Sequence, residues 1–235
     1  MKLSYWGSRL ELFSDALTSV RLQDAQIVDL VVPGSERPVE SPPPGAARDA
    51  PTVILSARRF DIADTRGSIE ATMLGHFVNS ILLRCSPVDR SLEIYRSWAA
   101  QSGVLMTAFD PKGVAWLAVA DLVEAIPLVA AQTESRRGQA FDVTGPERVP
   151  MDVLAESLSC ELGSPVVAET LDAQLLRGLL VRGGLEQAVA KWLVSHQLES
   201  SDSRLPATSP VLASILGRQP SSVLSRDTSK GVKHA

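Results

Sequence analysis

One short apolar run, TVILS at residues 52–56, constrains the fold of this chain more than any other stretch. Its apolar residues are consecutive, which is typical of a strand that is buried on both faces of a parallel sheet. A helix is expected from about Gly67 to Asn79, a second apolar strand from Ile81 to Leu83, and a helix from Asp89 to Gln101 that stops at Gly103. This alternation of strands and helices predicts an α/β protein with a parallel sheet.

The pattern continues in both directions along the chain. Upstream, the spacing of apolar residues predicts a helix from Ser8 to Val20 and a strand from Ile27 to Val32. The elements expected downstream are a strand at Val114 to Val119, a helix whose first turn Asp121 caps, a strand at Ala140 to Val143, a helix from Pro150 to Leu162 stopped by Gly163, a strand at Val166 to Ala168, and helices at Leu171 to Val181, Leu185 to Ser200 and Ser209 to Leu216.

A proline-rich segment interrupts this order. The nineteen residues from Pro33 to Pro51 include six prolines and two glycines. Such a composition offers too little apolar surface to pack and too much proline for regular structure. We expect an irregular, mobile excursion here, and a frayed polar end in the last ten residues.

Length and composition place the chain among ordinary globular proteins. The 235 residues are enough for one substantial core in one or two folding units. A net charge of -4 offers no basic surface for nucleic acid. The longest apolar run, residues 113–131, contains Asp121 and Glu124 and is therefore no membrane span, and Glu11 interrupts any signal peptide. A cytoplasmic protein is expected.

The two cysteines predict neither a disulfide framework nor a zinc site. Cys85 and Cys160 are far apart in the sequence, and no histidine lies at ligand spacing from either of them. We expect two reduced thiols, and no metal ligands are identified.

Three segments, in this order, resemble the NmrA-like branch of the atypical short-chain dehydrogenase/reductases, and most of all its festuclavine dehydrogenase type from fungal alkaloid pathways. They are GVAWLAVADLVEAIPLV at 113–129, GQAFDVTGPERVPMDVLAESLSCELGSPV at 138–166 and SPVLASILGRQPSSV at 209–223. The first resembles the strand and helix that close the sheet, the second the core of the substrate domain, and the third the terminal signature of the family. The resemblance covers most of the chain from about Thr52 onward.

The resemblance implies a fold, a cofactor and an activity. The fold would be a truncated or degenerate Rossmann-like parallel sheet with a helix-rich C-terminal substrate-binding part. Residues 1–132 would form the incomplete Rossmann-like domain, with the proline-rich excursion at 33–51, and residues 133–235 the substrate part. The cofactor would be NADP or NAD, and the reaction the reduction of an iminium or enone in specialised, alkaloid-type metabolism.

The glycine-rich loop that such a fold needs is not identifiable. Only glycine allows backbone N–H groups to approach the pyrophosphate at the start of a helix. The N-terminal part offers Trp6-Gly7-Ser8, with no second glycine in the first thirty-three residues, so no cofactor-binding residue is assigned. The chain is then either a truncated or mis-spliced reductase, or a descendant of one that lost the nucleotide and kept the pocket.

No catalytic residue is assigned either. Short-chain dehydrogenases use a tyrosine with a lysine four residues later, which lowers the pKa of the phenol. Here Ala99 stands four residues after Tyr95, and Arg9 stands four residues after Tyr5. Members of the festuclavine dehydrogenase type have the motif HEYL, and the residues that match its first half are Ile69 and Glu70, without the histidine.

Candidate pocket residues follow from the general position of ligands in open α/β sheets, beyond the carboxyl ends of the strands. They are Ser56, Ala57, Arg84, Cys85, Ser86 and Pro87. Ser56 could instead cap a turn and Arg84 could pair with Glu70. Cys85 has no neighbouring histidine or second cysteine that would activate it as a nucleophile.

Four other side chains have a structural interpretation beside a functional one. His76 lies among apolar neighbours in its helix and is expected to be structural rather than a general base, and His196 is weighed in the same way, although its helix could line the pocket. Trp98 and Trp116 could stack on a planar substrate or belong to the core.

Three alternatives to an active reductase remain open at this point. The chain could be a cofactor-independent cyclase or isomerase that uses the same pocket, a non-enzymatic NmrA-like regulator, or an inactive fragment. A small-molecule substrate is expected, with neither nucleic acid nor membrane as a partner, and the oligomeric state is left open.

Overall fold

The computed structural model describes residues 4–6, 26–29, 45–58, 65–202 and 204–224. The expected helix from Ser8 to Val20, the turn at Gly7, the proline-rich segment up to residue 44 and the polar end from residue 226 lie outside this part of the chain.

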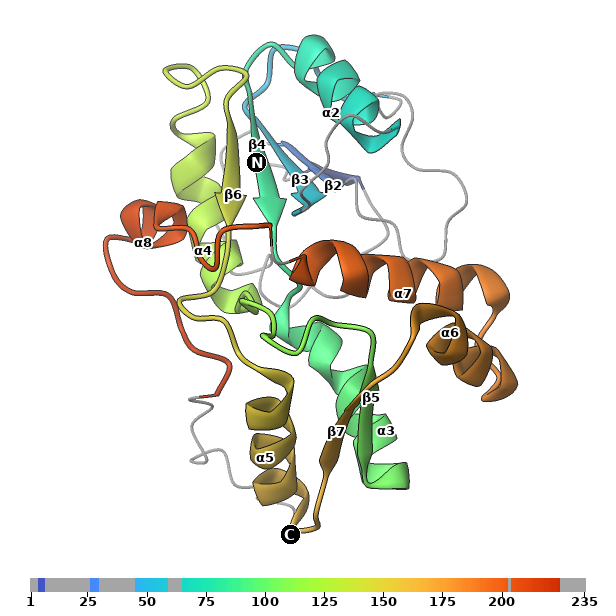
Figure 1. Ribbon diagram of the computed structural model, residues 1–235. Coiled ribbons are helices and arrows are strands. Elements are labelled where there is room, and N and C mark those ends of the chain that lie inside the picture. Colours follow the sequence, from blue (N-terminus) through green and yellow to red (C-terminus); the bar gives the residue numbers. More distant parts are fainter. Residues whose placement is uncertain (1–3, 7–25, 30–44, 59–64, 203, 225–235) are drawn as a thin grey trace, which may run out of the picture.

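A parallel sheet forms the upper half of the molecule in Figure 1. Its strands are β1 (Ser4–Trp6), β2 (Gln26–Asp29), β3 (Thr52–Ala57), β4 (Ser80–Cys85) and β6 (Ala140–Val143). They lie in the order β1-β2-β3-β4-β6, and every neighbouring pair is parallel. The expected parallel α/β architecture is confirmed.

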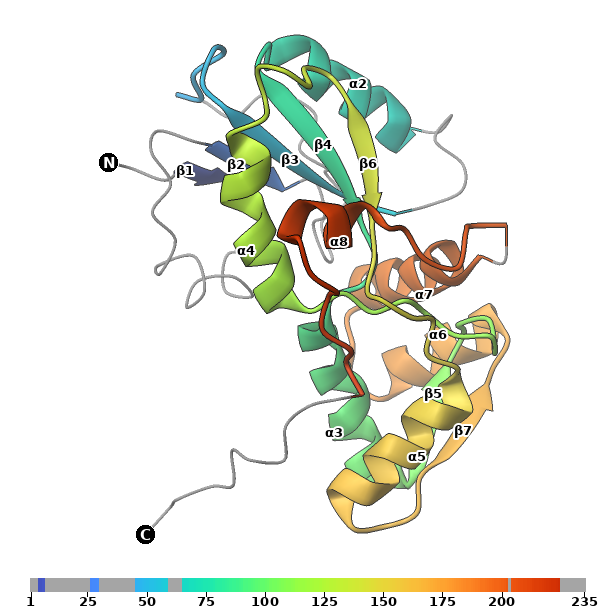
Figure 2. The same ribbon diagram turned by 90° about the vertical axis from the view of Figure 1, so that its left-hand side faces the viewer.

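Helices cover both faces of this sheet, and Figure 2 looks onto the face that α4 and α8 cover. They are α2 (Thr65–His76) on one face, and α4 (Val119–Ala130) with α8 (Val211–Leu216) on the other. Successive strand residues point to opposite faces. Val53 and Leu55 therefore pack in the cluster that includes residues of α4, whereas Ile54 packs in the cluster of Met73 from α2 and Phe77, which follows that helix. Burial on both sides explains the uninterrupted apolar run.

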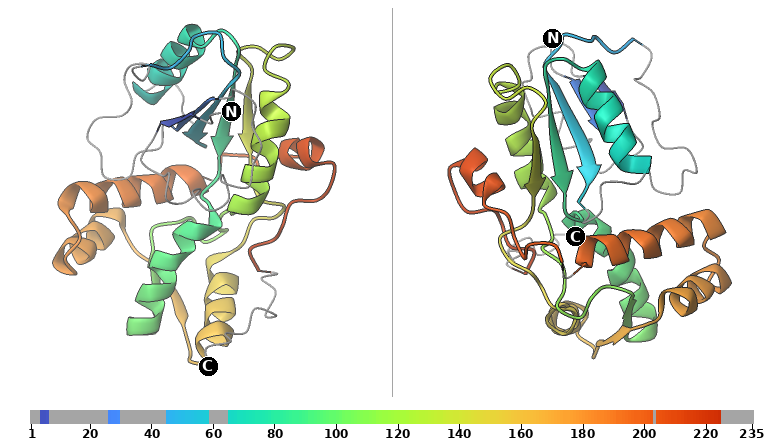
Figure 3. Two further views of the ribbon diagram at one scale, coloured as in Figure 1. Left: turned by 180° about the vertical axis from the view of Figure 1, so that it is seen from behind. Right: turned by 45° about the horizontal axis from the view of Figure 1, so that its top comes forward.

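A second, smaller sheet lies beyond the carboxyl ends of the large one. It consists of β5 (Val104–Thr107) and β7 (Val167–Thr170), which pair in parallel. The elements around it are the 3-10 turn η1 (Asp89–Ser91), α3 (Leu92–Ser102), α5 (Met151–Leu162), α6 (Ala173–Arg182) and α7 (Gln187–Ser201). Helix α7 runs across the molecule between the two sheets (Figures 1 and 3).

The sequence prediction of a strand from Val114 to Val119 is wrong. This segment forms only single bridges, from Val114 to Val149 and from Leu117 to Val88. It crosses from the small sheet to the large one, so no neighbouring strand accompanies it for more than one residue. Its burial on all sides explains why its sequence has the apolar content of a strand.

Asp121 does not cap helix α4, contrary to the expectation. The helix begins two residues earlier, at Val119, and the side chain of its N-cap residue makes no capping hydrogen bond. The buried Asp121 carboxylate instead accepts hydrogen bonds from Nη2 of Arg218, at 2.8 Å, and from the backbone N–H of Ser221. It thereby fastens the segment after α8 to the sheet half.

Both sheets join residues from the two sides of the expected boundary at 132/133. Strand β6, from the second part, pairs with β4 of the first part. Strand β5, from the first part, pairs with β7 of the second part.

Asp172 caps helix α6, which gives a first testable prediction. Its Oδ1 accepts hydrogen bonds from the backbone N–H groups of Gln174, at 2.8 Å, and Leu175, at 3.3 Å. Replacing Asp172 by alanine leaves both groups without this acceptor and is expected to lower the free energy of unfolding by about 1 kcal/mol. The exposed Glu156→Ala in α5 is the control and is expected to change it by less than about 0.5 kcal/mol. Equal urea-denaturation midpoints for the two variants would contradict the cap.

Candidate functional site

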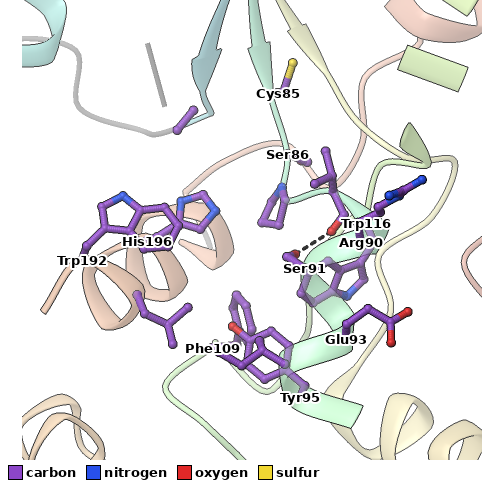
Figure 4. A pocket seen from close by; sticks show the side chains of 15 residues that line it. Cys85, Ser86, Arg90, Ser91, Glu93, Tyr95, Phe109, Trp116, Trp192 and His196 are labelled. Carbon is purple, nitrogen blue, oxygen red and sulfur yellow. Dashed lines mark hydrogen bonds between the residues drawn. The ribbon is translucent and has the colours of Figure 1, made fainter. Parts of the chain in front are cut away.

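A cavity of about 330 Å³ lies where β3 and β4 end, between the large sheet and α7 (Figure 4). Its sheet side is formed by Ala57 at the end of β3 and by Cys85, Ser86 and Pro87 at and after the end of β4. The carboxyl edge of a parallel sheet is the place where open α/β proteins bind their ligands. The cavity therefore occupies the position at which a ligand is expected.

Aromatic side chains form much of the remaining wall. Phe109 and Trp116 lie edge to face with ring centroids 5.4 Å apart, and the ring of Tyr95 lies 5.8 Å from that of Phe109. Across the cavity, Trp192 and His196 of α7 are stacked, with ring centroids 5.2 Å apart and planes 11° from parallel. Flat, apolar walls of this kind suit a flat, apolar ligand.

Charged side chains lie in the lining near the start of α3. The Glu93 carboxylate pairs with Arg96 at 2.5 Å, and its side chain is 60% exposed. Arg90 and Ser91 precede it, and the Ser91 hydroxyl donates a hydrogen bond to the carbonyl oxygen of Val88. The deeper wall is thus mainly apolar, and the charge is carried by side chains that reach solvent.

Tyr95 and Gln197 introduce a buried polar pair at the aromatic wall. Nε2 of Gln197 lies 2.9 Å from the hydroxyl oxygen of Tyr95, and Oε1 of Gln197 accepts a hydrogen bond from the backbone N–H of Ala108 at 2.6 Å. Burial raises the pKa of the Tyr95 phenol well above its ordinary value, and the hydrogen bond from Gln197 opposes this only in part. The phenol is therefore neutral throughout the physiological range.

Four of the six candidate pocket residues line this cavity, namely Ala57, Cys85, Ser86 and Pro87. Ser56 and Arg84 do not. They are partners in the register of β3 and β4, and both point to the α2 face, where the Ser56 hydroxyl lies 2.6 Å from Glu70 Oε1 and Arg84 Nη2 lies 2.8 Å from Glu70 Oε2. The pairing of Arg84 with Glu70 is thus present.

The other side chains weighed from the sequence fall in different places. His76 ends α2, away from the cavity, and contacts Phe77 edge to face at 4.8 Å. His196 and Trp116 line the cavity, and Trp116 is also part of the core, with 1% of its surface exposed. Trp98 lines a second cavity, between α3 and α6. Cys85 is buried, whereas Cys160 is exposed on α5.

Sequence reasoning missed Phe109 and Gln197 and set Tyr95 aside. Tyr95 was judged by the spacing to a lysine, which detects only one arrangement of a phenol donor. A signal for Gln197 was available, because it falls on the same face of the helix as Leu193 and Val194, which are buried. A polar residue on an apolar helix face needs a buried partner.

Arg58 connects the cavity edge at the end of β3 to strand β6 and to the segment after α7. Its guanidinium is 2% exposed, and it donates hydrogen bonds from Nε to Oδ2 of Asp142 and from Nη2 to the carbonyl oxygen of Pro206, both at 2.9 Å. A buried cation needs such partners, so the end of β3, strand β6 and the segment after α7 are held together next to Ala57.

Two classes of feature are not found in the described part of the chain. No group of three or more histidine, cysteine, aspartate or glutamate side chains there could hold a metal ion. None of its helices combines the length and the apolar character that crossing a membrane requires.

The fold is that of the Rossmann-like NAD(P)-binding reductases. The chain is similar to an NADPH-dependent quinone oxidoreductase of Escherichia coli, with a TM-score of 0.68, 18% identity, and coverage of 89% of this chain and 77% of that one. For the NADPH complex of the Escherichia coli enzyme, the TM-score is 0.68 and the identity 16%, with coverage of 94% of this chain and 87% of that one.

Another similar structure is the triphenylmethane reductase of Citrobacter sp. in complex with NADP(H), with a TM-score of 0.61, 17% identity, and coverage of 91% and 78%. A nucleoside-diphosphate-sugar epimerase of Staphylococcus aureus is also similar, with a TM-score of 0.57, 11% identity, and coverage of 90% of this chain and 78% of that one. The sequence matches no protein-family model and no curated protein. Identities this low establish a shared architecture.

Proposed function

We propose that this chain is an NAD(P)H-dependent reductase of the NmrA-like kind that acts on a flat conjugated small molecule, an iminium or an enone of specialised metabolism. The observation that carries the proposal is the aromatic-walled cavity at the carboxyl edge of the parallel sheet. The fold, shared with reductases that were crystallised with NADPH or NADP(H), supports it.

The described residues fit the nicotinamide end of such a cofactor. Ala57 has a small side chain at the end of β3, and Ser86 and Pro87 follow β4, so a planar ring can lie against this edge of the sheet. The turn after β1, which would face the pyrophosphate, lies outside the described residues. When bound, the reduced nicotinamide would supply a hydride.

The chain itself would bind and orient the substrate. The stacked Trp192 and His196 on one side, and Phe109 and Trp116 on the other, would hold a flat ring between them and keep water away. An enone would gain one hydride at carbon and one proton at the neighbouring carbon, so that its carbon–carbon double bond becomes a single bond. These walls would contribute by orienting the substrate rather than by supplying a strong acid.

Binding of NADPH gives the direct test. Titration followed by protein fluorescence is expected to show saturation below about 1 mM, the upper end of common affinities for such ligands. Ser86→Leu would fill the sheet side of the cavity and is expected to weaken binding at least about tenfold, since the larger side chain occupies ligand space.

Ser97→Leu is the matched control, because it makes the same change in the second cavity. It is expected to bind NADPH like the unmodified protein. Absence of binding to the unmodified protein at millimolar NADPH would eliminate the reductase proposal for this chain.

A second candidate function is cofactor-independent cyclisation or isomerisation in the same cavity. It is favoured by the single glycine in the first thirty-three residues, together with a cavity whose described lining residues all lie at position 57 or beyond. Conversion of a conjugated substrate by the purified protein without NADPH would support it, and a strict requirement for NADPH would exclude it.

A further inference from the structure

The buried pair of Tyr95 and Gln197 is a polar feature of the aromatic wall that the proposed function leaves unexplained. Tyr95 is 3% exposed and Gln197 is fully buried. Tyr95 rises from α3 at the lower side of the cavity in Figure 4, with its hydroxyl end turned toward α7. A buried polar pair is maintained only when its hydrogen bonds are satisfied.

The contact with Ala108 fixes the orientation of the Gln197 amide. A backbone N–H can only donate, so the atom 2.6 Å from the Ala108 nitrogen must be the acceptor Oε1. The amide nitrogen Nε2 then faces the Tyr95 hydroxyl at 2.9 Å. Since an NH2 group can only donate, the Tyr95 oxygen is the acceptor of this hydrogen bond.

The hydroxyl group of Tyr95 therefore does not donate its proton to Gln197. The structure records no acceptor for it among the described residues. Because burial raises the pKa of the phenol, this proton stays on the oxygen at neutral and mildly alkaline pH. Tyr95 lines the cavity, so the group to which its proton can be donated is a ligand within it.

We propose that Tyr95, oriented by Gln197, donates a hydrogen bond to a carbonyl oxygen of the bound molecule, so that the cavity selects flat conjugated ketones over iminium ions and over hydrocarbons of the same shape. A carbonyl oxygen has lone pairs that accept such a bond, whereas an iminium nitrogen has none. Glu93, the carboxylate among the described lining residues, is exposed and paired with Arg96, so the described part of the deep wall offers no anion for a cation.

This inference deepens the proposed function and rests on the same ligand cavity, but not on NAD(P)H. It can therefore be tested by equilibrium binding without a cofactor. Two probes suit the purpose, 9-fluorenone and fluorene, because they share a flat three-ring frame and differ in a carbonyl against a methylene group.

Calorimetric titration of the unmodified protein is expected to show about five- to thirtyfold tighter binding of fluorenone than of fluorene, the effect of one hydrogen bond in a mainly apolar site. Tyr95→Phe removes only the hydroxyl. Fluorenone is expected to fall to the affinity of fluorene, while fluorene binding changes by less than about twofold. Fluorene thus serves as the internal control for folding and packing.

Gln197→Glu gives an independent test with Tyr95 in place. One carboxylate oxygen still accepts from Ala108, and the other, at pH 9, accepts the Tyr95 proton and turns it away from the ligand. The preference for fluorenone is expected to disappear in this variant too. At a lower pH, protonation of the introduced carboxyl would supply a donor to Tyr95, and the preference would return.

The outcomes separate the two proposals. Equal affinities of fluorenone and fluorene for the unmodified protein, an equal loss for both in Tyr95→Phe, or no binding of either probe would overturn the inference. A retained preference in a protein that does not bind NADPH would support the inference and overturn only the reductase proposal.

Discussion

Replacing Gly145 by alanine is expected to lower the free energy of unfolding by about 3 kcal/mol or more. A Cβ atom on Gly145 would lie 1.8 Å from the carbonyl oxygen of Trp116 and 2.8 Å from its carbonyl carbon. Both are backbone atoms, so no side chain can rotate to make room. The backbone would have to separate, and Trp116 would leave its place between the core and the cavity.

Gly75→Ala is the matched control for this result. Gly75 lies in α2, and a Cβ atom built on it meets nothing within 4 Å. Because alanine favours a helix over glycine, this variant is expected to be up to about 1 kcal/mol more stable than the unmodified protein. Urea denaturation of the three proteins is the measurement. If Gly145→Ala has the same urea-denaturation midpoint as the unmodified protein, the close approach of Gly145 to Trp116 is wrong.

Replacing Glu70 by alanine is expected to cost about 3 to 5 kcal/mol, because it leaves a guanidinium without its partner beside a buried strand. The Glu70 side chain is 3% exposed and the Arg84 side chain 20%. Arg84 donates to Oε2 of Glu70 from Nε at 3.1 Å and from Nη2 at 2.8 Å, and the Ser56 hydroxyl donates to Oε1. All three hydrogen bonds are lost together.

Two further variants make this result interpretable. Glu134 pairs with Arg137 at 3.7 Å on the surface, with both side chains more than half exposed, so Glu134→Ala is expected to change stability by less than about 0.5 kcal/mol. The double variant Glu70→Leu with Arg84→Met removes the charge as well as its partner and is expected to be more stable than Glu70→Ala. A loss below about 1 kcal/mol for Glu70→Ala would show that the network contributes little.

The centre of the large sheet could be predicted from the sequence because strands β3 and β4 are buried on both faces. Strands β3 and β4 carry apolar side chains at consecutive positions, and helices follow both. Strand β5 was missed because only four residues of it pair, and they pair with β7, far along the chain. Residues 114–119 have the composition of a strand for a different reason, since they are buried but pair only through two single bridges.

The candidate site could be predicted at its sheet edge and not at its wall. Ala57, Cys85, Ser86 and Pro87 follow from the general rule that ligands lie beyond the carboxyl ends of parallel strands. That rule locates the edge of the sheet but does not say to which face of the sheet a side chain points. Ser56 and Arg84 were therefore included, although the alternation of side chains along their strands turns them toward α2.

The wall depends on contacts between residues far apart in the sequence. Gln197 meets Tyr95 and Ala108 only because α7 folds back across the molecule. The place of Gln197 on an apolar helix face indicates that it needs a buried partner, but no local pattern in the sequence identifies that partner.

The order of the strands along the chain affects how this protein folds, because β6 of the large sheet lies in the sequence between β5 and β7 of the small sheet. The pairing of β5 with β7 encloses β6, which belongs to the other sheet, so the small sheet cannot close before the loop that carries β6 has been laid down. Contacts of such long sequence separation slow folding and delay it until most of the polypeptide has been synthesised. Until β6 has been synthesised and paired, the edge of β4 stays open to strands of other molecules, which exposes the growing chain to aggregation.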